Sequence, residues 1–385
     1  MKNRYWLTNI PVIQFIKRVS AAKNISVWRI LLLTVYFIKL IAVTPLAALQ
    51  FLIYGRRINK TVITKQPVFI LGHYRSGTTY LQKLMAADPR FGFISSYDII
   101  CPNSSLLFGT PLRRVLQFVI DIFKIRTPFF NNSIPDLNEP AEEERFLINK
   151  GSAFTDYWRF VFPLCWEKWQ SCAELSKDPG YYKRWKKEYS CLLKMATFKS
   201  KKKQLILKSP VNTDRIRYLL EMFPDAKFIY LSRNPYHVFY STCNMWNKAI
   251  SKFRLQDLSG AQMEEIVFSE YVRLTEAYRR QRKFIPPGNL IEISYEELEN
   301  QPMNILRNIY AGLLLPDFEA VKKVFLEKLA EEKKYKPFEY KHSEAVFKKI
   351  EARWAKYVNE WKQQTAVQPV NEYINACDYA NNSNY

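Results

Sequence analysis

The chain has 385 residues, of which 48% are hydrophobic and 15% aromatic, so it can bury a substantial core and is not a disordered polypeptide. Its formal net charge of +22 favours an anionic partner, such as nucleic acid, an acidic membrane surface or a polyanionic small molecule. The six cysteines have no paired spacing, the three histidines are scattered, and no zinc-finger or RNA-binding motif is present. We therefore expect neither a disulfide framework nor a metal site, and no nucleic-acid partner.

The first predicted element is an apolar segment at residues 30–54, preceded by Arg29 and followed by Arg56 and Arg57. It is long enough to span a bilayer, which takes about 20 apolar residues. However, Lys39 near its middle is costly in a membrane, and cations flank both ends. We expect a helix or short hairpin in the interface, on anionic head groups, and keep a spanning helix and a helix packed on the domain as alternatives.

A strand, a glycine loop and a helix are predicted next. Residues 67–71 form a short buried strand, residues 72–77 a tight loop, and the helix begins at Ser76. A helix N-terminus that follows a glycine loop offers free N–H groups and a positive dipole end to a phosphate.

The loop side chains add to this predicted anion site. Gly77 lets the backbone approach an anion closely, and four neighbours supply hydroxyl or guanidinium donors: Arg75, Ser76, Thr78 and Thr79. Gly72 and Gly77 have the spacing of a nucleotide triphosphatase loop, but Thr78 occupies the position of its lysine. This difference argues against ATP or GTP chemistry, which needs that lysine at the terminal phosphates.

An acidic cluster, Glu142–Glu144, follows Pro140 and precedes an apolar run. Clustered carboxylates can raise one another's pKa, which suits a general base. The alternative is an acidic first helical turn that the helix dipole favours. Glu142 and Glu144 are the preferred candidates, and three further residues remain as alternatives: Asp98, His73 and His237.

Three more strands are predicted, at residues 205–208, 228–231 and 291–294. Lys208 stands at the end of the first of these strands, and Arg233 follows the end of the second. Ligands of open parallel sheets bind beyond the carboxyl ends of the strands, so we expect Arg75, Lys208 and Arg233 to converge there. The predicted fold is α/β: a P-loop-like central parallel sheet flanked by helices, with an N-terminal apolar helical segment.

The Arg-Ser-Gly-Thr-Thr loop at residues 75–79 resembles the 5′-phosphosulfate loop of sulfotransferases that use 3′-phosphoadenosine 5′-phosphosulfate (PAPS). Arg233, at a strand end, and Ser241, eight residues later, resemble the family's 3′-phosphate site. Two further segments resemble the bacterial-type branch: Leu-Lys-Ser-Pro, which ends at Pro210, and Pro-Ala-Glu-Glu-Glu, which begins at Pro140. The cytosolic branch differs in two respects. It has lysine in place of Arg75, and it has a late Arg-Lys-Gly loop for which this chain has no convincing match. The resemblance covers roughly residues 62–340.

The resemblance implies transfer of a sulfuryl group from PAPS to a hydroxyl, with no metal. It assigns the 5′-phosphosulfate to Arg75, Ser76, Gly77, Thr78 and Thr79, and the 3′-phosphate to Arg233 and Ser241. For catalysis, the resemblance implies that Arg75 stabilises the leaving oxygens and that Lys208 faces the sulfuryl group. Glu142 or Glu144 would act as the base. Six aromatics are candidates to line an apolar acceptor pocket: Phe129, Phe130, Tyr157, Trp158, Trp166 and Trp246.

These observations together predict a membrane-associated helical segment at 1–60 and a sulfotransferase domain at 61–385. A lipid or sterol-like acceptor fits an enzyme at an anionic membrane surface, and we expect the cytoplasmic side of a bacterial membrane. The alternatives are a carbohydrate acceptor, an ATP-dependent phosphotransferase, and a non-catalytic nucleotide-binding membrane adaptor. The identity of the acceptor and the oligomeric state stay open.

Overall fold

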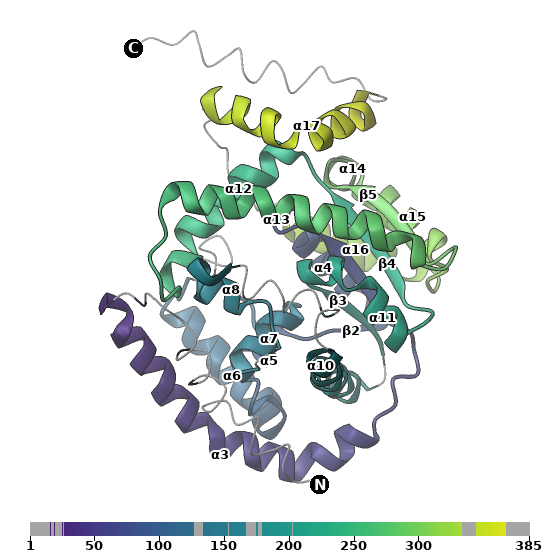
Figure 1. The fold of residues 1–385 in the computed structure, drawn as a ribbon. Helices are drawn as coiled ribbons and strands as arrows, with labels where there is room; N and C mark the ends of the chain where they lie inside the picture. Colours follow the sequence, from purple (N-terminus) through teal and green to yellow (C-terminus); the bar gives the residue numbers. More distant parts are fainter. Residues whose placement is uncertain are drawn as a thin grey trace.

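The computed structural model describes residues 27–126, 134–152, 154–166, 179–201, 203–332 and 344–366, and the single positions 16, 19, 25 and 175. Its centre is a five-stranded parallel sheet in the order β2-β3-β1-β4-β5 (Figure 1). The strands are β1 (Val68–Gly72), β2 (Phe91–Gly92), β3 (Gln204–Lys208), β4 (Lys227–Ser232) and β5 (Leu290–Ser294). The predicted parallel sheet is confirmed, and β1 begins and ends one residue later than expected.

The strand register brings the carboxyl ends of the central strands to one edge. Gly72 of β1 pairs with Leu231 of β4, and Ser232 pairs with Ser294 of β5. On the other side of β1, Ile70 pairs with Lys208, the last residue of β3. The residues that follow these strands therefore start from neighbouring points.

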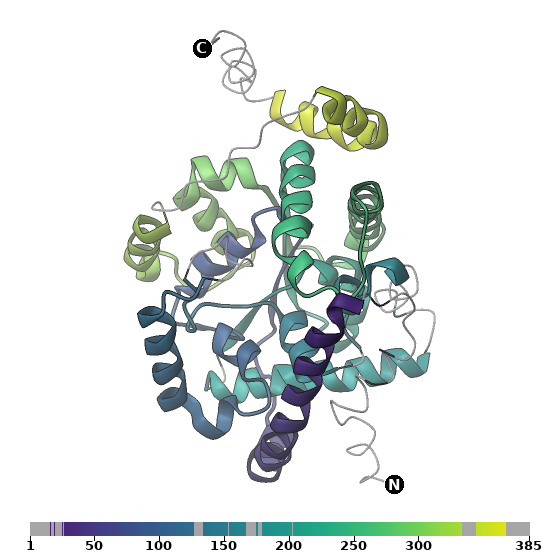
Figure 2. The same ribbon diagram turned by 90° about the vertical axis from the view of Figure 1, so that its left-hand side faces the viewer.

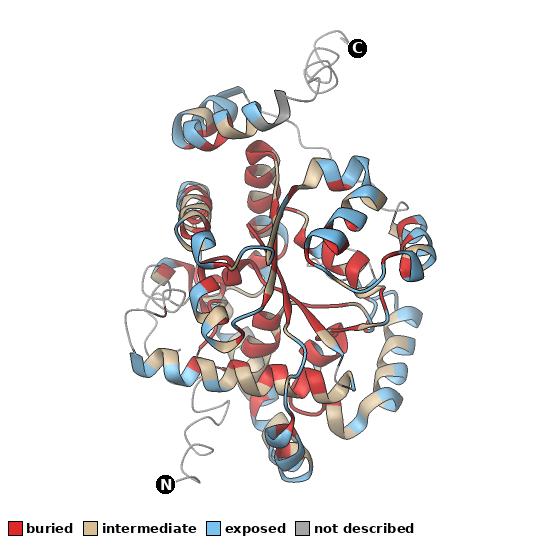
Figure 3. Ribbon diagram, turned by 90° about the vertical axis from the view of Figure 1, so that its right-hand side faces the viewer, coloured by how far each residue is buried: buried red, intermediate tan, exposed pale blue. Residues whose placement is uncertain are grey.

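Helices cover both faces of the sheet (Figures 1 and 3). The helices of the described residues, apart from α3, are α4 (Thr78–Ala86), α5 (Ser96–Ile100), α6 (Ser105–Ile122), α7 (Glu143–Lys150), α8 (Trp158–Val161), α10 (Pro179–Lys199), α11 (Ile216–Met222), α12 (Pro235–Lys248), α13 (Gly260–Gln281), α14 (Tyr295–Asn300), α15 (Pro302–Gly312), α16 (Lys322–Glu332) and α17 (Glu344–Ala366).

The sheet has a hydrophobic core on each face because successive strand side chains point to opposite sides. Phe69 and Leu71 of β1 pack in the core that contains α10 and α11. Val68 and Ile70 pack in the core that contains α4, α15 and α16. Burial on both sides explains why β1 is apolar at every position before its terminal glycine.

The N-terminal apolar segment is a single helix, α3 (Ile30–Lys60), that continues through Pro45. Leu40 and Ile58 on its inner face are buried against the domain, and the Tyr36 hydroxyl donates to the Ile148 carbonyl oxygen at 3.2 Å. Its part from Leu33 to Lys60 contains an 18-residue window with mean hydropathy 1.8, and is long and apolar enough to cross a membrane by length and composition. The hairpin alternative is not observed, and the division of the chain at residue 60 stays a prediction.

The folded domain continues into α17, which packs on α12 and α13. Trp354 is fully buried among Phe239, Phe268 and Tyr271, and its indole N–H donates to the Phe268 carbonyl oxygen at 3.2 Å. The core thus extends beyond residue 340, where the sequence resemblance ended.

Candidate active site

The loop between β1 and α4 has the backbone conformation of an anion cradle. Gly77 is the N-cap of α4, with a φ of 93°, and has no side chain with which to cap the helix. A Cβ at this position would lie 2.2 Å from the Tyr295 ring, so a larger residue cannot fit without a shift. Ser76 closes the turn by donating its hydroxyl to the His73 carbonyl oxygen at 2.8 Å. The first N–H groups of α4 have no partners within the helix, and their dipole favours an anion.

The residues expected at the two phosphates of PAPS meet beside this loop. Arg75 Nε donates to Ser241 Oγ, the distance between these atoms being 2.8 Å, and Arg233 Nη1 donates to the Arg75 carbonyl oxygen at 3.0 Å. Arg75, at a φ of 67°, has the left-handed backbone that turns its side chain toward α12. Two cations and a hydroxyl from three separate segments therefore surround the N-terminus of α4.

Tyr295, the first residue of α14, forms one wall of this cation cluster. The Arg233 guanidinium lies 4.1 Å from the centroid of its ring. The same ring lies against Gly77. No motif in the sequence singles out Tyr295, so its position beside Arg233 and Gly77 could not be predicted from residue spacing.

A second group, built on Lys208, joins the loop to the acidic cluster. The ammonium of buried Lys208 donates to Thr79 Oγ1 at 3.0 Å and forms an ion pair with Glu142 Oε1. The other Glu142 oxygen accepts from the Tyr157 hydroxyl. The neighbouring Glu143 accepts from the Lys208 backbone N–H at 3.1 Å. A carboxylate that could act as a base, Glu142, thus lies beside a cation, Lys208, and a hydroxyl donor, Thr79. This arrangement suits a site where a proton is removed from a reacting group.

Glu142 and Lys208 stabilise each other's charged form, which burial alone would disfavour. Burial alone would raise the pKa of Glu142, but the Lys208 ammonium and hydrogen bonds from Lys208 and Tyr157 hold that pKa below its usual value. Burial lowers the pKa of Lys208, and the Glu142 carboxylate opposes this shift. Burial and the adjacent Glu142 carboxylate raise the pKa of Tyr157 well above its usual value, so its hydroxyl remains a donor.

Glu144 lies in a different environment from Glu142. It is fully buried, forms an ion pair with Arg215, and accepts from the Thr155 hydroxyl at 2.5 Å. Burial raises the pKa of Glu144, and the Arg215 guanidinium opposes that shift. Arg215 Nη2 also lies 3.2 Å from an Asp156 oxygen, and Asp156 in turn pairs with Arg159. These contacts make Glu144 the end of a buried chain of ion pairs.

Two of the alternative bases, Asp98 and His73, make contacts that give them a structural role. Asp98 closes the capping box of α5 with Ser95 and forms an ion pair with Lys199 at 2.6 Å. His73 Nδ1 lies 2.7 Å from the Tyr74 carbonyl oxygen, and burial lowers the pKa of His73 to about 4. His237 is the third residue of α12 and is half-buried.

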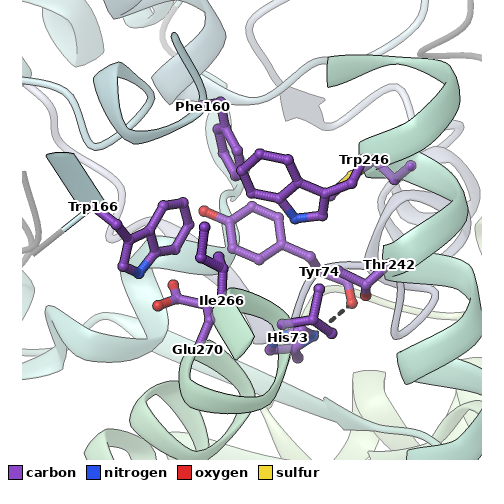
Figure 4. A pocket seen from close by; sticks show the side chains of 10 residues that line it. His73, Tyr74, Phe160, Trp166, Thr242, Trp246, Ile266 and Glu270 are labelled. Carbon is purple, nitrogen blue, oxygen red and sulfur yellow. Dashed lines mark hydrogen bonds between the residues drawn. The ribbon is translucent and has the colours of Figure 1, made fainter. Parts of the chain in front are cut away.

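The expected acceptor aromatics fall into separate groups. Trp166 and Trp246 line a small pocket with Tyr74 and Phe160, and its volume of about 10 Å³ has room for about one water molecule (Figure 4). Tyr157 contacts Glu142 instead, and Trp158 is buried against α3 in a cluster with Leu40. Phe129 and Phe130 lie outside the described residues.

A parallel α/β sheet with a glycine loop at a helix N-terminus, flanked by cations, is typical of proteins that bind a phosphate-bearing ligand at the carboxyl edge of the sheet. The sulfotransferase family model matches residues 67–320, about two thirds of the chain, so the chain belongs to the sulfotransferase family. The match includes the loop, the acidic cluster, Lys208, Arg233, Ser241 and Tyr295.

Individual relatives agree with this assignment. The chain is 29% identical, over 314 residues, to proteins named omega-hydroxy-beta-dihydromenaquinone-9 sulfotransferase Stf3 from Mycobacterium bovis and Mycobacterium tuberculosis. That alignment covers 81% of this chain and 79% of each relative. Among solved structures, sulfotransferase STF9 from Mycobacterium avium has a TM-score of 0.65 at 20% identity, covering 83% of this chain and 84% of that one. STF1 from Mycobacterium tuberculosis H37Rv has a TM-score of 0.63 at 17% identity, covering 82% and 85%. The predicted family and fold are confirmed.

Proposed function

We propose that this protein transfers the sulfuryl group of PAPS to the hydroxyl of a lipid acceptor. The observation that carries the proposal is the meeting of Arg75, Ser241 and Arg233 at the N-terminus of α4, beside the Glu142–Lys208 pair. The first group suits a donor with two separate phosphates, and the second suits proton removal from an alcohol. The described residues therefore provide groups for both halves of the reaction.

In the proposed reaction, the acceptor oxygen attacks the sulfur atom in line with the leaving phosphate. An oxygen–sulfur bond forms, the bond from sulfur to the bridging oxygen breaks, and that electron pair stays on the 5′-phosphate. Arg75 and the N–H groups of α4 stabilise this charge, and Lys208 faces the sulfuryl oxygens from the Thr79 side. The acceptor proton passes to the Glu142 carboxylate. We assign the base to Glu142 and not to Glu144 because Glu144 is enclosed with Arg215.

Two observations support a lipid acceptor over a carbohydrate. The mycobacterial relatives are named for an omega-hydroxy dihydromenaquinone, a hydrophobic molecule with a terminal hydroxyl. The outer face of α3 presents exposed apolar side chains, including Leu31, Val35, Ile38 and Leu52. Its inner face packs along the domain, which favours a helix lying in the interface plane of a membrane. We propose the cytoplasmic side of a bacterial membrane for this helix.

The donor proposal predicts a distinctive ligand preference. Adenosine 3′,5′-bisphosphate should raise the Tm of the full-length protein without magnesium, because Arg233 and Ser241 are the residues that we propose bind its 3′-phosphate. ATP should raise the Tm much less, since Thr78 stands where a kinase has its lysine. The measurement is a thermal unfolding series with each nucleotide, with and without magnesium. A stronger effect of magnesium-ATP would favour the phosphotransferase alternative instead.

A further inference from the structure

The surface helix α6 has an apolar face that the domain leaves uncovered. Of its eighteen residues, all described, Ser105 alone is buried. Leu112, Leu116 and Ile120 are half-buried toward the domain. Outward-facing Val115, Phe118, Ile122 and the following Phe123 are 56–72% exposed. Large apolar side chains gathered on one helix face are typical of a docking surface.

The start of α6 lies beside α3, and a kink at Gly109, with a φ of 47°, separates this start from the apolar face at residues 112–123. The Gln50 side chain of α3 donates to the Pro102 carbonyl oxygen at 3.3 Å and accepts from the Leu106 backbone N–H at 2.9 Å. These bonds fix the start of α6 beside α3. Both helices lie at the end of the molecule opposite α17 (Figures 1 and 2). Two amphipathic helices therefore share one end of the domain.

The charges around these helices match an anionic surface. The first acidic residue of the chain is Asp88, so α3 and its flanks carry cations alone, including Arg56 and Arg57. On α6, Arg113 and Arg114 line a groove of about 340 Å³ beside Phe118. Lys124 and Arg126 follow the helix and are exposed. The one acidic side chain of α6, Asp121, is hydrogen-bonded by the Gln117 amide at 3.0 Å.

We propose that α3 and α6 together form a membrane-docking surface, in which α6 inserts Phe118 and Ile122 among the acyl chains while Arg113 and Arg114 contact anionic phospholipid head groups. The occupant we assign to the α6 face is the bilayer itself.

Gln117 also connects α6 to the catalytic side of the domain. Its side chain accepts from the Leu137 backbone N–H at 2.8 Å and donates to the Pro135 carbonyl oxygen at 3.2 Å. This bonded segment leads directly to Glu142. The α6 surface is therefore tied by hydrogen bonds to the chain segment that precedes the proposed base.

The test measures binding of full-length protein to vesicles by flotation, without PAPS or acceptor. Wild type should bind vesicles of equal parts phosphatidylglycerol and phosphatidylcholine, weaken at high salt, and bind pure phosphatidylcholine poorly. The Phe118→Asp/Ile122→Asp variant should bind the anionic vesicles at least about tenfold more weakly. The matched control is Leu314→Asp/Leu326→Asp, two exposed apolar residues outside α3 and α6, which should bind like wild type.

Vesicle binding by the α6 variant within about twofold of wild type would overturn the proposal. So would a dimer in sedimentation velocity that this variant dissociates while its vesicle binding is unchanged, because the face would then serve a second copy of the chain. Hydrogen exchange of wild type supplies a check that needs no folded variant: amides of residues 105–125 should gain protection with anionic vesicles. Unchanged exchange would also overturn the proposal. Since no sulfation is measured, none of these three outcomes bears on the proposed sulfotransferase activity.

Discussion

Replacing Glu142 by glutamine should lower kcat by about 100-fold or more, while the affinity for adenosine 3′,5′-bisphosphate stays within a few-fold of wild type. Glutamine keeps the size of the side chain but cannot accept the acceptor proton. The measurement is steady-state sulfation with a soluble alcohol together with a nucleotide-binding titration. Glu139→Gln is the matched control, since Glu139 also pairs with a lysine and its side chain is 16% exposed, compared with 17% for Glu142. Its kcat should be unchanged.

Glu144→Gln should behave differently from Glu142→Gln, and this difference separates the two candidate bases. It removes one of the two carboxylate partners of the buried Arg215 guanidinium and leaves Asp156 as the other, so we expect a loss of up to about 3–5 kcal/mol of stability and a lower Tm. The folded fraction should keep turnover within a few-fold of wild type. If Glu144→Gln abolishes turnover in folded protein while Glu142→Gln does not, the assignment of the base is wrong.

The pH profile gives an independent view of the same carboxylate. Glu142 acts as a base only when ionised, that is, above its pKa, and the Lys208 pair holds that pKa below the usual 4.5. Turnover should therefore show no acidic limb from Glu142 above about pH 5. Lys208→Met removes the cation and leaves the burial, so the remaining activity should fall at a higher pH than in wild type.

The two arginines of the donor site should divide between binding and catalysis. Arg233→Ala should weaken binding of adenosine 3′,5′-bisphosphate by about 2–4 kcal/mol, because a phosphate charge would lose its cation. Arg75→Ala should lower kcat by more than it weakens binding, because the Arg75 charge is placed at the leaving oxygen. Titration of this nucleotide and single-turnover rates with PAPS separate the two effects.

The control for these arginine variants is Arg307→Ala. Arg307 is exposed and pairs with Glu319 on the surface, so its loss should change neither quantity. Equal losses of affinity for the two donor-site variants, with no added fall in kcat for Arg75→Ala, would contradict the division of labour.

The sequence predicted those parts of the site that depend on local backbone. The glycine loop has few conformations open to it, and a cation at a strand end must lie near the edge of a parallel sheet. Arg75, Lys208 and Arg233 could therefore be expected to converge, and the structure places them around the N-terminus of α4. Ser241 followed from its family spacing to Arg233, and it contacts Arg75.

Contacts between distant segments could not be predicted from a single sequence. Glu142 and Glu144 are two residues apart, yet one contacts Lys208 and the other Arg215, because Glu142 is the N-cap of α7 and Glu144 lies within its first turn. The ion pair between Arg159 and Glu270 joins segments 111 residues apart. Such pairs depend on tertiary packing, which residue spacing does not encode.

The most direct test of the central claim is to incubate purified full-length protein with PAPS and membrane lipid extracts and to search for products by untargeted mass spectrometry. The account predicts a lipid that gains one SO₃ group, formation of an equal amount of adenosine 3′,5′-bisphosphate, and loss of both products with Glu142→Gln. Gain of SO₃ in glycan extracts but not in lipid extracts would contradict the proposed acceptor. Transfer of phosphate from ATP, with no SO₃ gain in any extract, would contradict the proposed reaction.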